Sequence, residues 1–166
     1  MLPYIFMEKK GIHIIDLNKT NESLVRAASA IKNIARSGRK ILFVATKKQA
    51  KEVVTEAAKS VNMPYVTERW LGGMLTNFVT IRKSIKKMQN IQKMLDETGS
   101  GLTKKERLVL GRELEKLNRV LGGIEHLNRV PGALYLVDIS HEHLALSEAK
   151  RMGLVTFGMV DTNSDP

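Results

Sequence analysis

The sequence predicts an α/β fold: a doubly wound parallel sheet with an inserted antiparallel α-helical coiled-coil hairpin. Two observations predict it. Towards both ends of the 166-residue chain, short β-branched runs alternate with segments of helical period, as in parallel sheets with helices on both faces. The middle instead carries two successive heptad patterns, typical of a helical hairpin. We therefore expect an α/β domain over residues 1–75 and 123–166, and the hairpin over residues 76–122.

The elements of the first half follow from the spacing of apolar residues. Residues 12–15 predict a strand, and residues 21–37 predict a helix that ends before Gly38. Residues 41–44 form a continuous apolar run, typical of a strand buried on both faces, and residues 65–66 predict a brief further strand. The first helix has an apolar face made of Leu24, Ala27, Ala28, Ile31 and Ile34. The helix between the last two strands has apolar residues at Ala50, Val53, Val54, Ala57, Ala58 and Val61.

Two heptad helices predict the inserted hairpin. The first has apolar residues at Ile81, Ile85, Met88 and Leu95, with Gln92 in the remaining core position. The second has them at Leu110, Leu114, Leu117, Leu121 and Ile124. Glycines within residues 98–101 predict the turn, and the capping-box spacing of Thr103 and Glu106 predicts where the second helix begins. A first helix over residues 77–97 is about 30 Å long, enough to protrude from the α/β body.

The α/β pattern resumes after the hairpin. Residues 133–137 and 155–160 are β-branched or aromatic runs that predict strands. Between them, residues 142–152 have helical spacing, and Ser140 is the expected N-cap of that helix.

The charge balance of the chain predicts a polyanionic partner. The formal net charge is +10 and the sequence pI is about 9.9, and each phosphate that such a protein neutralises releases condensed counterions. No apolar run approaches the roughly 20 residues that span a bilayer, and residues 1–6 lack the features of a signal peptide. Cysteine is absent, which excludes disulfides and thiol chemistry. We expect a soluble, cytoplasmic protein.

The turn after the strand at residues 41–44 is a candidate phosphate site. Thr46 and Gln49 have capping-box spacing, so a helix is expected to begin there with free backbone N–H groups. Lys47 and Lys48 lie at that positive helix end, where an anion relieves their unfavourable position. Solvated lysines on a well-capped helix are an equal alternative. Ligands of such folds bind at the carboxyl ends of the strands, which favours phosphate contact.

The first hairpin helix carries a basic stripe of Arg82, Lys83, Lys86, Lys87 and Lys93. Like charges at i,i+4 repel by a few tenths of a kcal/mol, so the stripe destabilises an isolated helix and suits a phosphate backbone. An ordinary solvated face explains the mixed charges of the second helix well and those of the first poorly. We therefore predict RNA contact by the first helix.

A tryptophan–glycine loop at residues 69–77 supplies the remaining candidates. Arg69 and Asn77 carry polar groups suited to phosphate or sugar contacts. Trp70 can stack on a base, but a lone tryptophan more often anchors a loop to a core, and we favour that interpretation.

Catalytic and metal chemistry has little support. His141 and His143 are two residues apart and point in different directions on a helix, so helix initiation explains them better than a metal site. The chain has no G-x-G-x-x-G or phosphate-loop motif and no activated nucleophile. We expect no catalytic residue, no cofactor and no metal.

The same loop carries a family resemblance. Residues 69–73 (Arg-Trp-Leu-Gly-Gly) and 75–78 (Leu-Thr-Asn-Phe) resemble a motif of the bacterial small-subunit ribosomal protein two family. Further matching segments are residues 3–6, 11–17, 41–50, 63–66 and 160–166. The resemblance implies a flavodoxin-like domain with the inserted hairpin. It also implies a structural role in the small ribosomal subunit, with contacts to small-subunit rRNA and neighbouring ribosomal proteins, including ribosomal protein one. It implies neither a small-molecule substrate nor a membrane partner.

The chain departs from the family pattern at its termini and in one loop. Family members have segments before Pro3 and after Pro166 that are missing here, so we expect a fragment or a truncated copy. Residues 138–143 replace proline and basic residues, which weakens any RNA contact there. Two alternatives remain: a nucleotide-binding α/β enzyme with a coiled-coil insertion, and a protein-interaction scaffold.

Overall fold

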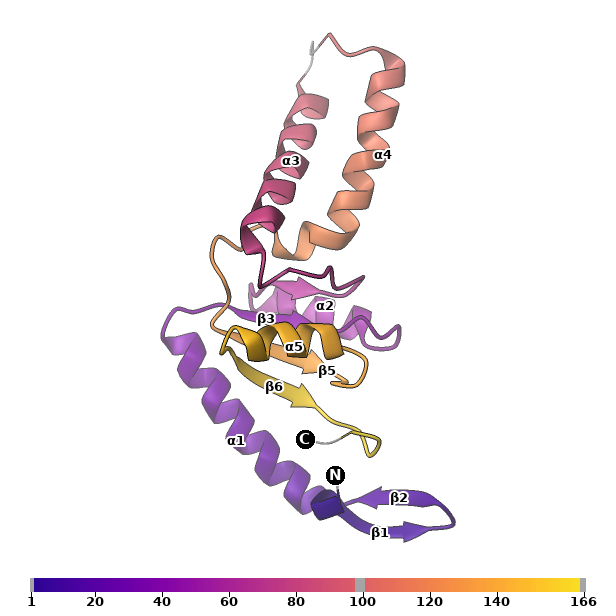
Figure 1. Ribbon diagram of the computed structural model, residues 1–166, viewed down its shortest axis with the longest axis vertical. Coiled ribbons are helices and arrows are strands. Elements are labelled where there is room, and N and C mark those ends of the chain that lie inside the picture. Colours follow the sequence, from indigo (N-terminus) through magenta and orange to yellow (C-terminus); the bar gives the residue numbers. More distant parts are fainter. Residues whose placement is uncertain (1, 98–100, 165–166) are drawn as a thin grey trace.

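The centre of the molecule is a parallel sheet. In the computed structural model, which describes residues 2–97 and 101–164, four strands pair in the order β4-β3-β5-β6 (Figure 1). Their bounds are Ile41–Val44 for β3, Tyr65–Val66 for β4, Ala133–Val137 for β5 and Val155–Met159 for β6. All four coincide with predicted strands, except that β6 ends one residue early. The predicted α/β class with a parallel sheet is confirmed.

The two central strands join segments that lie far apart in the sequence. β3 pairs with β5 in register from Ile41 opposite Ala133 to Val44 opposite Leu136. All four of these residues are buried, as expected for strands covered on both faces. The edge strand β6 is more open, with Val155 50% exposed and Met159 53% exposed.

Helices α2 (Lys51–Ser60) and α5 (His143–Arg151) cover opposite faces of the sheet, with α5 in front and the fainter α2 behind in Figure 1. The caps predicted for these two helices are wrong. Ala50 precedes α2 and makes no side-chain cap, because Thr46 bonds to Glu142 instead of capping a helix. Ser140 shares a hydrogen bond with Ser164, and Glu142 is the residue that precedes α5.

The middle of the chain forms two helices that lie side by side above the sheet, α3 (Phe78–Asp96) and α4 (Lys104–Leu121), which we call the helical pair (Figure 1). The capping box of Thr103 and Glu106 is confirmed. Ile91 is buried while Gln92 is exposed, so the predicted core position of Gln92 is wrong by one residue. The short helix η2 (Gly122–Ile124) continues α4 to a contact with β4 of the sheet. Most of the predicted glycine turn, residues 98–100, lies outside the described residues.

The strand at residues 12–15 does not belong to the parallel sheet. It is β2 (Ile12–Ile15), and it pairs antiparallel with β1 (Ile5–Lys9), which follows the short helix η1 (Leu2–Tyr4). Lys10 and Gly11 form the turn with positive φ angles of 54° and 76°, as two-residue hairpin turns of type I′ require. The predicted strand is confirmed, but it belongs to a separate two-stranded sheet with β1 and not to the parallel sheet.

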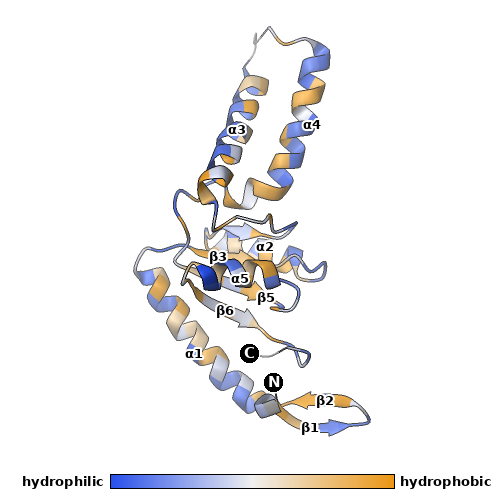
Figure 2. Cartoon of the chain, viewed as in Figure 1, coloured by the Kyte–Doolittle hydropathy of each residue, from blue (hydrophilic) through white to orange (hydrophobic). Residues whose placement is uncertain are grey.

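Helix α1 (Leu17–Arg36) begins four residues before its predicted start. The Asp16 carboxylate accepts hydrogen bonds from the backbone N–H groups of Asn18 and Lys19 and so caps it. No residue of α1 is buried, and Leu24, on the apolar face that the spacing predicts, is 65% exposed. Figure 1 shows the reason: α1 runs from the sheet towards β1 and β2 and leaves the sheet behind. Hydrophobic stretches remain visible along α1 and β2 in Figure 2.

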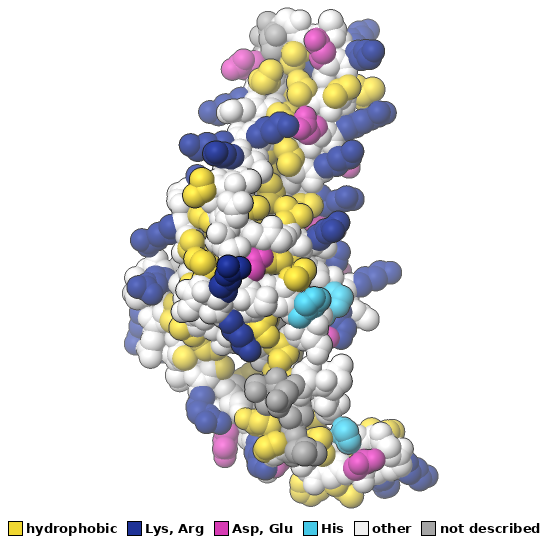
Figure 3. Space-filling view, in the orientation of Figure 1, with side chains coloured by type: hydrophobic (Ala, Val, Ile, Leu, Met, Phe, Trp, Pro, Cys, Tyr) yellow, Lys and Arg dark blue, Asp and Glu magenta, His cyan; other side chains and the backbone are white. Residues whose placement is uncertain are grey.

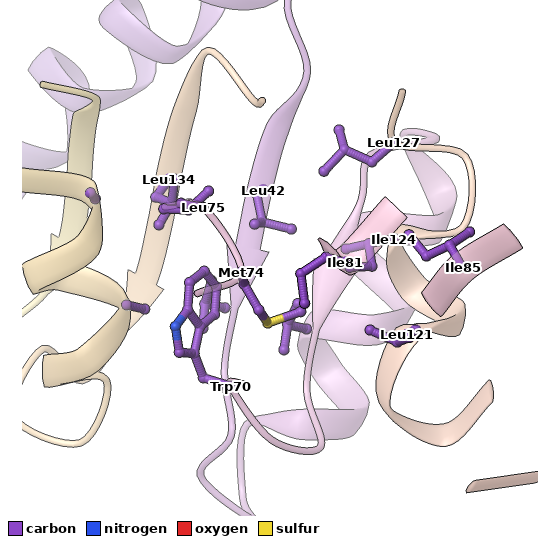
Figure 4. Packing of buried hydrophobic residues seen from close by; sticks show 14 of the residues in the cluster. Leu42, Trp70, Met74, Leu75, Ile81, Ile85, Leu121, Ile124, Leu127 and Leu134 are labelled. Atoms are coloured by element: carbon purple, nitrogen blue, oxygen red, sulfur yellow. The ribbon is translucent and has the colours of Figure 1, made fainter. Parts of the chain in front are cut away.

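The core lies where the sheet meets the base of the helical pair. Leu42 and Leu134 from the sheet pack in one cluster with Trp70 and with Leu121 of α4 (Figure 4). No buried side-chain polar atom in the described residues lacks a hydrogen-bond partner. Among those same residues, no helix has the length and apolar character needed to cross a bilayer.

Candidate nucleic-acid interface

Trp70 belongs to the core and not to the surface. Its side chain is only 6% exposed, and its Nε1 donates to Glu148 Oε1 at 3.1 Å. A ring packed in this way cannot stack on a base, so its inclusion among the RNA-binding candidates is corrected. The core-packing interpretation is the one that the structure supports.

Glu148 of α5 holds the loop from inside. Its carboxylate accepts hydrogen bonds from Trp70 Nε1, from the backbone N–H groups of Gly73 (2.7 Å), Leu75 (3.0 Å) and Thr76 (3.1 Å), and from the Thr76 hydroxyl (3.1 Å). Burial raises the pKa of Glu148, but these hydrogen bonds outweigh it, so the pKa lies below its usual value. Sequence reasoning missed this residue because a single glutamate on a helix carries no local signal.

The anchored loop leaves its two polar candidates on the surface. Arg69 and Asn77 are exposed. Asn77 is the residue before α3, and its Oδ1 accepts from the Thr80 hydroxyl at 2.8 Å. The rigid backbone behind these side chains fixes where they emerge, which suits contact with a phosphate or ribose.

The carboxyl ends of β3 and β5 are tied together by two carboxylates. The Thr46 N–H and hydroxyl both donate to Glu142 Oε1, and Glu142 is only 3% exposed. Lys47 Nζ donates to Asp138 Oδ2 at 2.8 Å. This hydrogen bond raises the pKa of Lys47 and lowers that of Asp138. The charge of Lys47 is therefore already compensated, whereas Lys48 is exposed and has no ion-pair partner in the described residues.

Acid is expected to break the Lys47–Asp138 pair. The hydrogen bond from Lys47 holds the pKa of Asp138 below its ordinary value of 3.8. Because the folded-state pKa is the lower one, the stabilisation is complete above about pH 4 and is lost as the pH falls through the folded pKa. The free energy of unfolding of Asp138→Asn should therefore vary less steeply below pH 4 than that of the wild type, as denaturant titrations at several pH values measure. Asparagine suits the positive φ of 68° at this position, and equal slopes in both proteins would contradict the expectation.

The basic stripe of α3 divides into two groups. Lys83, Lys86 and Lys93 are exposed and form no ion pair among the residues that the structure describes. Lys87 Nζ pairs with Glu113 Oε1 of α4. Arg82 is half-buried, and its guanidinium donates to the Leu127 carbonyl at 3.1 Å.

The two groups serve different purposes. Lys87 joins the two helices and Arg82 ties α3 to the segment after η2, so these side chains support the helical pair. Figure 3 shows Lys and Arg side chains, in dark blue, projecting from the helical pair.

Of the two histidines after β5, His141 lies in the turn before α5 and His143 is the first residue of α5. The His141 backbone N–H donates to the Asp138 carbonyl and carboxylate, which fixes the turn before α5. Glu142, between the two histidines, is directed to Thr46. Within residues 2–97 and 101–164 no group of three or more histidine or acidic side chains could hold a metal ion.

Comparison with known proteins places the chain in a family. The family model described as Ribosomal protein S2 matches residues 1–166. The chain is 65% identical to small ribosomal subunit protein uS2 of Cytophaga hutchinsonii over 167 aligned residues, which cover all of this chain and 66% of that protein. It is 60% identical to the protein of the same name from Chlorobium chlorochromatii. This alignment also covers all of this chain, and 66% of that relative. The uS2 of Bacteroides thetaiotaomicron is 59% identical, with 60% of it covered.

These relatives are longer than this chain, which spans 60 to 66% of their lengths. The family model nevertheless matches residues 1–166, which include the tryptophan–glycine loop and the helical pair. The chain belongs to the Ribosomal protein S2 family.

Proposed function

We propose that this chain is a structural, non-enzymatic constituent of the small ribosomal subunit in the cytoplasm, where it binds small-subunit rRNA. The match to the Ribosomal protein S2 family over all 166 residues carries the proposal, and the similar relatives are named small ribosomal subunit proteins. The net charge of +10 supports a phosphate-rich partner.

The helical pair is proposed to be a coiled-coil insertion, residues 76–122, in a flavodoxin-like domain formed by residues 1–75 and 123–166. The buried face of α3 supports this proposal, because Ile81, Ile85, Met88 and Ile91 recur every three or four residues. A rigid two-helix arm of this kind carries its surface cations away from the sheet and holds them in a fixed arrangement.

The RNA-binding surface is proposed to comprise the exposed polar candidates: Lys48, Arg69, Asn77, Lys83, Lys86 and Lys93. Lys83 and Lys86 are three residues apart on α3 and lack a carboxylate partner within the described chain, so they repel each other. Phosphates would relieve this repulsion. The proposed surface leaves out Lys47, Arg82 and Lys87. Their charged groups are already held by Asp138, by carbonyl oxygens and by Glu113, respectively.

Neighbouring small-subunit proteins, including ribosomal protein one, are proposed as further partners. The surface best suited to protein contact lies on β1, β2 and α1, where Phe6 is 71% exposed, Ile12 is 68% exposed and Leu17 is 77% exposed. Where exposed apolar side chains form a contiguous patch, they typically mark protein–protein contacts.

Salt dependence tests the proposed function. The variant Lys83→Gln/Lys86→Gln/Lys93→Gln is expected to bind purified small-subunit rRNA more weakly, because three phosphate contacts are lost. Each contact contributes about 0.7 to 0.9 to the slope of log affinity against log salt, so the slope should become shallower by about 2 to 3. At about 0.15 M salt this corresponds to a loss of roughly 50- to 150-fold in affinity. Filter binding over a salt series measures both quantities.

A matched variant controls for net charge. Lys9→Gln/Lys10→Gln/Lys150→Gln removes the same charge from the β1–β2 hairpin and from α5, outside the proposed surface, and should keep the wild-type slope. Failure of the wild-type chain to bind the rRNA, or to sediment with small subunits, would reject the proposed function. Equal losses in both variants would reject only the assignment to α3.

The alternative of a nucleotide-binding enzyme has no support from the comparisons. Ligands of such sheets bind at the carboxyl edge where the strand order reverses, which here lies between β3 and β5. Hydrogen bonds from Thr46 to the buried Glu142 carboxylate already cross that position.

A further inference from the structure

The amino ends of the sheet strands carry a second set of cations. Arg39 and Lys40 directly precede β3, and Arg129 lies in the segment that leads into β5. Lys59 lies in the last turn of α2, before β4. Because the strands are parallel, these side chains come from the edge of the sheet opposite to the tryptophan–glycine loop, and none of them belongs to the surface described above.

Two adjoining hollows lie at this edge. One, of about 340 Å³, is lined by Arg39, Lys40 and Arg129 together with the segments before β5 and β6. The other, of about 280 Å³, is lined by Lys40 and Lys59 together with the segment before β4 and the base of the helical pair. Lys40 is common to both, so we call the two together the amino-edge cleft. No aspartate or glutamate lines either hollow.

The charges of the amino-edge cleft are not compensated within the described chain. Arg39, Lys40 and Arg129 are exposed and form no ion pair with any described carboxylate. The opposite edge differs, because Lys47 there pairs with Asp138 and Lys51 with Glu68. The fold thus pairs Lys47 and Lys51 with carboxylates at one edge and leaves Arg39, Lys40 and Arg129 at the other without such a partner among the described residues.

Three of the four cationic side chains of the cleft, those of Arg39, Lys40 and Lys59, are held in position. A Cβ at Gly132 would lie 2.7 Å from Arg39 Cβ and 2.8 Å from Arg39 Cδ, so the arginine stem lies directly on the glycine backbone. Lys40 Nζ donates to the Asn62 carbonyl at 2.7 Å. Lys59 Nζ lies 5.9 Å from the centre of the Tyr65 ring. Side chains that are ordered in this way lose less conformational entropy when they bind a ligand.

We propose that the amino-edge cleft is a second phosphate-binding surface, in which Arg39, Lys40 and Arg129 contact the ribose-phosphate backbone of RNA. The choice of RNA over other polyanions rests on the proposed function. The cleft is open and lined by cations without carboxylates, and phosphate contacts of arginine and lysine bind and orient RNA without reading its sequence. Together with the exposed lysines of α3, it places cations both on the helical pair and at the edge of the sheet.

The variant Arg39→Gln/Lys40→Gln/Arg129→Gln tests this proposal. Its affinity for purified small-subunit rRNA should fall by about 50- to 150-fold near 0.15 M salt, with a slope of log affinity against log salt that is shallower by about 2 to 3. The variant Lys9→Gln/Lys10→Gln/Lys150→Gln, with the same net charge, should bind like the wild type. Thermal unfolding of each variant checks that folding is unchanged.

A second variant tests the cleft without changing the charge. Gly132→Ala keeps every cation but places a Cβ 2.7 Å from Arg39 Cβ, which cannot rotate away, so the backbone at residue 39 must shift together with the arginine stem. It should therefore weaken rRNA binding by roughly four- to sixfold at about 0.15 M salt, the loss expected for one phosphate contact, and its thermal unfolding shows how far the shift also lowers stability. Arg39→Gln alone should have the same effect, and combining the two changes should add nothing further. Additive losses would mean that Gly132→Ala acts elsewhere, and would overturn the role assigned to Arg39.

The outcomes separate this proposal from the proposed function. If the wild-type chain binds rRNA and the cleft variant binds with the same affinity and slope, the cleft proposal is rejected and the proposed function stands. If the wild-type chain does not bind rRNA at all, the proposed function fails first. Loss of binding to vesicles of phosphatidylserine and phosphatidylcholine, with rRNA binding retained, would assign the cleft to lipid headgroups instead. Competition by millimolar inorganic phosphate as strong as that by rRNA fragments would indicate a free-phosphate site.

Discussion

Replacing Glu148 with alanine is expected to release the tryptophan–glycine loop and to lower the free energy of unfolding by about 3 kcal/mol or more. The Glu148 carboxylate accepts hydrogen bonds from Trp70 Nε1, from three backbone N–H groups and from the Thr76 hydroxyl. Trp70 and Leu75 are buried, so their donors lose their partner where water has little access. Each unsatisfied buried donor costs about 1 to 3 kcal/mol.

The fluorescence of the protein reports this change directly, because Trp70 is the only tryptophan. Emission from Glu148→Ala should shift to longer wavelength as the indole meets water, and its denaturation midpoint should fall. Glu148→Gln is expected to lie between the wild type and Glu148→Ala, since its carbonyl oxygen still accepts from one set of donors while its amide N–H₂ faces the other. The control is Glu115→Ala on the exposed face of α4, which should leave both emission and midpoint unchanged. An unshifted emission spectrum in Glu148→Ala would show that the core holds Trp70 without the carboxylate.

Elements that depend on local sequence could be predicted, and those that depend on distant partners could not. The strands β3 and β5 are continuous apolar runs, and the Thr103–Glu106 capping box lies within four residues, so both are visible in the sequence. Thr46 and Gln49 have the same spacing, yet Thr46 bonds to Glu142, 96 residues away. Nothing near Thr46 indicates that partner, and the cap predicted there was wrong for this reason.

Amphipathic spacing indicates a helix but does not show whether its apolar face is covered. The spacing predicted α1 as a helix, but not that α1 leaves the sheet and exposes Leu24. Burial of that face requires a partner surface, and the direction in which α1 leaves the sheet is set by tertiary packing. The strand β2 is a similar case. Its residues favour a strand, but its pairing with β1 depends on the turn at Lys10 and Gly11.

In the candidate interface, too, local features could be predicted and distant partners could not. The cations can be counted in the sequence, but the sequence does not show which of them a carboxylate from another element neutralises. Lys87 meets Glu113 of the other helix, and Lys47 meets Asp138, 91 residues away. The amino-edge cleft was missed because its cations come from separate connecting segments that only the parallel sheet brings to one edge.

Replacing Gly123 with alanine is expected to unseat the helical pair from the sheet. A Cβ at Gly123 would overlap the Tyr65 carbonyl oxygen and would lie 2.8 Å from two carbons of the Tyr65 ring. The carbonyl belongs to the backbone of β4 and cannot rotate away, so η2 must move as a whole. Overpacking of this kind typically costs about 1 to 3 kcal/mol, and we expect the upper part of that range because backbone is involved.

Two further glycines of the same segment provide graded controls. Gly111, within α4, would place a Cβ in open space, so Gly111→Ala should stabilise the chain by about 0.5 to 1 kcal/mol through helix propensity. A Cβ at Gly122 would meet only the side chain of Asn118, which can rotate, so Gly122→Ala should lie between the other two. Denaturant titration of all three variants gives the order of stability. If Gly123→Ala were as stable as Gly111→Ala, the helical pair could not pack against β4 as closely as the Tyr65 contact requires. Its lysines would then not be held at a fixed position relative to the amino-edge cleft.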